Sequence, residues 1–125
     1  MDLRKLKEFL LDETGTPEII GGIESEIEVY KNALAKKGAS APVIGTNDDF
    51  QYVIKREDVQ KLCDLYLAGQ LDEWHLNYIA NLIELSSSFS MESKRVEEAV
   101  FDLSSPEING DINAERIRII LESLE

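Results

Sequence analysis

The chain has 125 residues, of which 43% are hydrophobic, so it can bury one ordinary core without disulfides or metals. Its 25 acidic and 13 basic residues give a net charge of -12, which repels nucleic-acid phosphates and anionic membrane surfaces. We therefore expect a single domain over residues 1–125 that binds neither nucleic acid nor a membrane. The same charge would attract a basic partner, or it serves only to keep the protein in solution.

Cysteine usage and the first residues indicate a compartment. The lone Cys63 excludes an intramolecular disulfide, which suits a reducing environment, and its apolar neighbours predict a buried thiol. Residues 1–12 alternate charge with leucine and lack the apolar run of a secretion signal. We expect a cytoplasmic protein.

Residues 1–38 are expected to form a helical arm. Leucines at positions 3, 6 and 10 predict a short first helix. A second helix should begin at Thr16-Pro17-Glu18, with a hydroxyl cap, proline in the first turn and an acid near the positive end of the dipole. It carries an apolar stripe that could pair with a second copy of the chain: Ile20, Ile23, Ile27, Tyr30 and Leu34.

Residues 39–54 are predicted to form a linker that ends in a short extended segment. Glycine, proline and Thr46-Asn47-Asp48 break the helical pattern. Phe50, Tyr52 and Ile54 then recur with a period of two, which is typical of a strand. One arrangement is a β-hairpin near residues 42–54, in which this strand pairs with Val43-Ile44.

Residues 55–125 are predicted to be an acidic helical core. The segment 71–85, LDEWHLNYIANLIEL, is apolar around most of its girth, which indicates a central helix enclosed by others. Helix caps are expected at Asp72, Ser90 and Asn113. The predicted fold is therefore mainly all-α, a small bundle of about five to six helices.

Signatures of catalysis are missing from the sequence. It contains no GxxxxGK[ST], GxGxxG, HExxH, CxxC or GxSxG motif. One His and one Cys are too few for a zinc site, and a partial calcium-loop pattern starting at Asp111 has Arg116 where the loop requires glycine. We expect no catalytic residues, no metal site and no cofactor.

An acidic, aromatic surface is the remaining candidate site. Residues 48–125 carry 17 acidic and 7 basic side chains, and aromatic residues adjoin several of the acids. Interfaces often combine aromatic anchors with charges that steer a partner. The acids also act as helix caps and dipole partners, which explains part of their placement. The predicted partner-binding residues are Asp48, Asp49, Phe50, Tyr52, Glu57, Asp58, Asp72 and Glu73.

The run IKREDVQKLCDLYLAGQLDEWHLNYIANLIELS, followed by VEEAVFDLSSPEING and a final amphipathic helix, resembles bacterial toxin-immunity proteins. These are small partners of contact-dependent growth-inhibition, colicin-like and related polymorphic toxins. The resemblance covers roughly residues 50–125 and concerns the order of elements, so it transfers no binding residues. It implies that an acidic helical protein neutralises a basic nuclease toxin by binding at or beside its active site.

The leading hypothesis is therefore an immunity protein that occludes a cognate toxin, with Tyr52, Phe50 or an edge of Trp74 as the aromatic anchor. The alternative is a helical adaptor or regulatory domain, homodimeric through residues 20–34. A third reading, an enzyme subunit or cryptic metal enzyme, has little in the sequence to support it.

Overall fold

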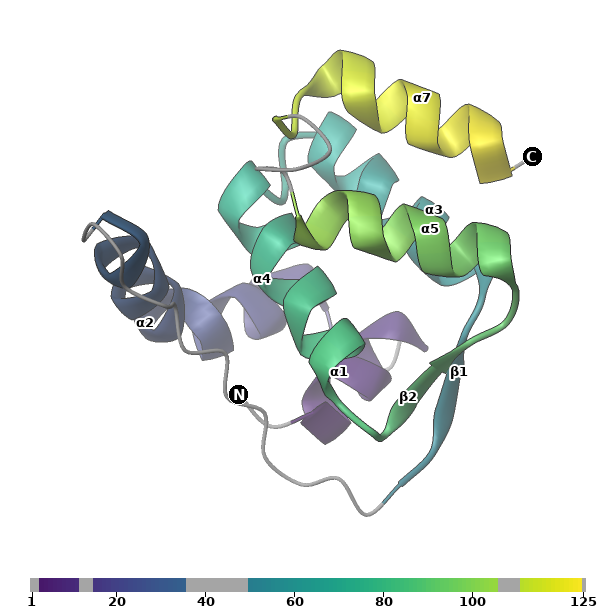
Figure 1. The fold of residues 1–125 in the computed structure, drawn as a ribbon. Coiled ribbons are helices and arrows are strands. Elements are labelled where there is room, and N and C mark those ends of the chain that lie inside the picture. Colours follow the sequence, from purple (N-terminus) through teal and green to yellow (C-terminus); the bar gives the residue numbers. More distant parts are fainter. Residues whose placement is uncertain (1–2, 12–14, 36–49, 106–110, 125) are drawn as a thin grey trace.

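The computed structural model describes residues 3–11, 15–35, 50–105 and 111–124. Within these ranges the chain forms six helices and two short strands (Figure 1). In chain order they are α1 (Leu3–Leu10), α2 (Thr16–Ala35), β1 (Tyr52–Ile54), α3 (Arg56–Leu67), α4 (Glu73–Leu85), β2 (Phe89–Met91), α5 (Lys94–Ser104) and α7 (Ala114–Leu124). The prediction of a mainly helical bundle with a short extended segment is confirmed.

The helices are arranged around α4, as its sequence predicts. Helix α5 packs along α4, and α7 lies across α3 and α5 on one side, whereas α1 and α2 lie on the other side (Figure 1). Nearly every residue from His75 to Ile83 is buried, and the exposed hydrophobic side chain is Leu85 at the end of the helix. Enclosure on several sides is what an all-round apolar helix requires.

The N-terminal arm contributes to the same core. Leu6 and Phe9 of α1 and Ile19, Ile23 and Ile27 of α2 are buried in one cluster with the residues of α4. Ile23 and Ile27 therefore belong to the core of this chain and do not form an open face for a second copy. The side chains of Tyr30 and Leu34 lie outside the described residues.

The two strands pair in parallel, with Tyr52 opposite Phe89 and Ile54 opposite Met91. A parallel pair needs a long crossover connection, and α3 and α4 together supply it. The strand at Tyr52–Ile54 agrees with the sequence prediction, but β2 was not predicted. Val43-Ile44, the partner expected in a hairpin, lies outside the described residues.

Of the three helix caps predicted within residues 55–125, two are confirmed and one is wrong. The Asp72 carboxylate accepts the His75 N–H of α4 at 2.9 Å, and Asn113 accepts the Arg116 N–H of α7 at 2.8 Å. Ser90, however, lies in β2, and the cap of α5 is Ser93, which accepts the Val96 N–H at 3.3 Å. The helix begins later than expected because residues 89–91 pair with β1.

Candidate functional site

The structure does not gather the predicted partner-binding residues into one surface. Asp48 and Asp49 lie outside the described residues. Glu57 is exposed in the first turn of α3, whereas Asp72 and Glu73 are exposed beyond its last turn, where α4 begins. A helix of 12 residues is about 18 Å long, so the two groups are separated by the length of α3.

Tyr52 and Asp58 are interior residues, which corrects their assignment to a contact surface. Tyr52 is 9% exposed and Asp58 is 6% exposed. The Tyr52 hydroxyl donates to the Asp58 carboxylate at 2.9 and 3.1 Å, and the Lys55 N–H donates to the same group at 2.9 Å. Burial, and then the hydrogen bond and charge of Asp58, raise the pKa of the Tyr52 phenol. The pair joins β1 to the start of α3.

Phe50 is half-buried at the edge of this strand pair. Its ring meets Phe89 edge to face with centroids 5.6 Å apart, and Lys7 Nζ of α1 lies 5.4 Å from its centroid. One face of the ring is therefore occupied by groups of the chain itself. Phe50 acts at least partly as a contact between β1, β2 and α1.

Carboxylates do converge at the junction of α4 and α2, around His75. Nδ1 of His75 accepts the Asp72 N–H at 3.0 Å, so the neutral ring carries its proton on Nε2 and donates it to Glu24 Oε1 at 2.8 Å. A protonated ring would instead aim Nδ1–H at Asp72 Oδ1, 3.2 Å away. In both states the imidazole holds Glu24 of α2 beside Asp72 of α4.

We call Glu24, Asp72 and Glu73, with the half-buried Trp74 that follows Glu73 in α4, the α2/α4 acidic site. The side chains of Glu24 and Asp72 are 51% and 55% exposed, so a partner can reach their oxygens. Glu24 was not predicted as a site residue, because it lies 51 positions from His75 and on its own helix it reads as one of several solvated acids. Only the packing of α2 on α4 brings it here.

Cys63 is completely buried in α3, as predicted. Burial, with a smaller contribution from the Asp64 carboxylate, raises the pKa of the thiol from 9.0 to about 12. A nucleophilic cysteine needs a lowered pKa and access to solvent. The side chain fits a structural role in the core.

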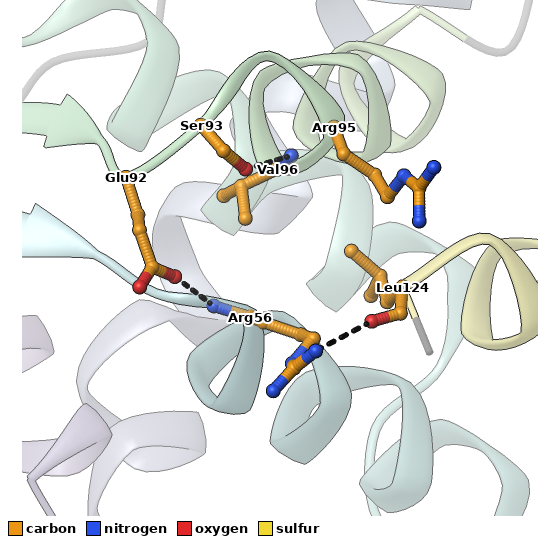
Figure 2. Close-up of a pocket in the computed structure, with 6 residues that line it drawn as sticks. All are labelled: Arg56, Glu92, Ser93, Arg95, Val96 and Leu124. Carbon is orange, nitrogen blue, oxygen red and sulfur yellow. Dashed lines mark hydrogen bonds between the residues drawn. The ribbon is translucent and has the colours of Figure 1, made fainter.

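Four basic residues gather at one end of the molecule, among the exposed glutamates Glu57, Glu92, Glu97 and Glu98, and this feature was not predicted. Lys55 and Arg56 follow β1, and Lys94 and Arg95 follow β2, and all four are exposed. Between them is a cleft with a volume of about 290 Å³, lined by Arg56, Glu92, Ser93, Arg95, Val96 and Leu124 (Figure 2). The signal available in the sequence was two Lys/Arg pairs, each at the start of a helix in an acidic chain. The parallel strand pairing that brings the two pairs together could not be read from it.

Other site classes find no support in the described part of the chain. There, no three His, Cys, Asp or Glu side chains are grouped so that they could hold a metal ion. None of the helices in those ranges combines the length and apolar character that crossing a membrane requires. Comparison with protein-family models, curated proteins and solved structures finds no match.

Proposed function

We propose that the protein is a non-catalytic binding partner of a basic protein domain and acts as an immunity protein of the toxin-neutralising type. The observation that carries the proposal is the α2/α4 acidic site, where His75 holds exposed carboxylates from two helices together and Trp74, the residue before it in α4, is half-buried. Complementary charges accelerate encounter, and a desolvated aromatic anchor slows dissociation.

The distribution of charge over the surface favours this site over the rest of the molecule. Of the five exposed basic residues of the region 50–124, four lie at the far end of α3, so they do not offset the carboxylates at the start of α4, and the fifth, Arg118, lies on α7, which packs on α3 and α5. The two remaining half-buried cations are engaged within the chain. Lys61 donates to the Phe9 carbonyl, and Arg116 pairs with Asp102 at 3.3 Å.

Inhibition would follow from occlusion alone. A nuclease groove is positively charged because it must attract phosphates. Carboxylates on a rigid helix junction would occupy that groove in place of the nucleic acid, with no reaction in the inhibitor. The capping bonds of Asp72 and the His75–Glu24 contact fix the acids in advance, which lowers the entropy lost on binding.

The experiment is a binding measurement against the product of the neighbouring gene, combined with a protection assay in cells that express that product. The test variant is Asp72→Asn/Glu73→Gln, since Asn retains an oxygen that can cap α4. The matched control is Glu97→Gln/Glu98→Gln on exposed positions of α5, which removes the same charge. We expect the test variant to lose about ten-fold or more in affinity, mainly through slower association at low salt, and the control to lose far less.

Two results would count against the proposal, and they are separable. Absence of both binding and protection would remove the immunity function. Equal losses in the two variants would keep a basic partner but move its contact away from the α2/α4 acidic site.

A further inference from the structure

The capping box at the start of α4 contains a residue that can change its charge. In the usual box a Glu or Gln three positions past the cap reaches back to the N–H of the capping residue. Here His75 holds that position, and its Nδ1 accepts the Asp72 N–H at 3.0 Å, while the Asp72 carboxylate accepts the His75 N–H at 2.9 Å. A Glu or Gln oxygen accepts such a bond at any neutral or mildly acidic pH, whereas Nδ1 accepts it only while the ring is neutral.

The imidazole is enclosed, and both of its nitrogens are engaged. The side chain of His75 is 10% exposed, and Nε2 lies 2.8 Å from Glu24 Oε1 of α2. Nδ1 lies 3.2 Å from Asp72 Oδ1, in addition to its bond with the Asp72 N–H. A proton on Nδ1 therefore replaces a bond to a backbone N–H with a contact to a carboxylate that is already within reach.

Within the described residues, the charged groups in contact with the ring are carboxylates. Glu24 comes from α2, and Asp72 comes from the start of α4 itself. The connection from α3, residues 68–71, is uncharged. Helix α5 meets this part of α4 through Asn77, which donates to two backbone carbonyls, and β2 follows the opposite end of α4. Protonation of the ring thus places a positive charge between two carboxylates and offsets one of the three negative charges of the α2/α4 acidic site.

We propose that His75 makes the α2/α4 acidic site responsive to pH, so that a basic partner binds more tightly when the ring is neutral than when it is protonated. The inference rests on the proposed function, because it concerns the charge of the same site. Protonation leaves Glu24 and Asp72 in place but pairs both with the imidazolium, which opposes the approach of lysine and arginine side chains. Histidine is the side chain that changes charge between about pH 5 and pH 8, and the chain has one. Affinity is therefore highest at the alkaline end of this interval and falls as the pH falls.

The test measures the binding of an N-acetylated oligolysine peptide at about pH 8 and about pH 5.5, at constant low ionic strength. Lysine, aspartate and glutamate side chains keep their charges over this range, so the imidazole is the side chain that changes. We expect the parent to bind about three-fold or more weakly at the lower pH. His75→Gln should bind equally at both pH values, since a Gln oxygen can still accept the Asp72 N–H. An equal loss of affinity in the parent and in this variant would overturn the proposal.

A relocated histidine is the matched control. The double variant His75→Gln/Ser87→His places a titratable ring on an exposed turn beyond the last residue of α4, a helix length away from Asp72. It should bind oligolysine with as little pH dependence as His75→Gln. If it regained the pH dependence of the parent, net charge and not the contacts of His75 would set the affinity, and the proposal would be rejected.

NMR of the free protein tests the same contacts without a partner. The Asp72 amide proton should titrate together with the ring of His75, because its acceptor is lost on protonation. A ring that titrates with no change at the Asp72 amide would contradict the proposed exchange of partners.

Failure of this inference and failure of the proposed function give different results. Oligolysine binding that is independent of pH in the parent would overturn the pH response and leave the α2/α4 acidic site as a contact surface. Absence of binding at both pH values would remove the acidic site as a contact surface, and the pH response with it.

Discussion

At the scale of single residues, Tyr52 and Asp58 were predicted to lie on a contact surface, but they are buried and form a hydrogen bond with each other. An aromatic residue beside acids looks like an interface anchor, but alternation along β1 turns both Tyr52 and Ile54 inward. Asp58 follows inward because, three residues past the cap, it accepts the Lys55 N–H. A capping acid and a surface acid are not distinguishable by residue type.

The Tyr52→Phe variant should lower the free energy of unfolding by about 1–3 kcal/mol, because the buried Asp58 carboxylate loses its phenol donor. Urea unfolding followed by circular dichroism measures the change. Tyr66→Phe, on a half-buried tyrosine of α3, is the matched control and should cost less, since water can reach its surroundings. Equal costs for the two variants would show that the Asp58 contact is not special.

Cys63 predicts a loss of stability at alkaline pH. The unfolded thiol ionises near pH 9.0, whereas the folded thiol keeps its proton up to about 12, so its contribution is complete below pH 9.0 and is lost as pH rises through this interval. Between about pH 9 and about pH 11 the loss approaches about 1.4 kcal/mol per pH unit. Unfolding titrations of the parent and Cys63→Ala should therefore show a shallower alkaline decline in the variant. Identical slopes would mean that the folded thiol ionises near its ordinary pKa.

At the scale of elements, the residue at which α5 begins decides which serine caps the helix. The sequence alone could not choose between Ser90 and Ser93. Ser93→Ala should cost about 1 kcal/mol of stability, because the Val96 N–H loses its cap acceptor. Ser90→Ala, on an exposed position of β2, should change stability by less than about 0.5 kcal/mol. Thermal unfolding of both variants tests the helix boundary, and a larger effect at Ser90 would restore the boundary predicted from sequence.

The sequence was informative about helices because their evidence is local. The central helix 73–85 and the caps Asp72 and Asn113 rest on spacing and side-chain chemistry within a few residues. Strand β2 has only three residues, and its partner lies 37 positions earlier, so no local period reveals it. The cleft and the α2/α4 acidic site depend on such long-range pairings, which is why neither could be predicted.

At the scale of the whole molecule, a net charge of -12 opposes the compact state through self-repulsion. The placement of acids along the helices adds to this cost. The last turns of α3, α4, α5 and α7 contain no basic residue to complement the negative end of the dipole. In α7 an exposed acid, Glu122, occupies that turn instead. Added salt screens this repulsion and should therefore stabilise the protein. If the surface charges attracted one another overall, the same salt would destabilise it.

Two exposed acids of α7, Glu115 and Glu122, allow the effect of net repulsion to be separated from the effect of the helix dipole. They carry the same charge on the same helix, but they lie at its opposite ends. Glu122→Gln should raise the free energy of unfolding by up to about 1 kcal/mol at low salt, because it relieves the net charge and the unfavourable helix end together. Glu115→Gln, in the first turn of the same helix, relieves the net charge but removes a favourable dipole contact, so it should be nearly neutral. At about 1 M salt, where the screening length falls to about 3 Å, both variants should approach the parent. Half the sum of the two low-salt changes in the free energy of unfolding then measures self-repulsion, and half their difference measures the dipole effect. A sum of zero would show that the acidic surface does not destabilise the folded protein.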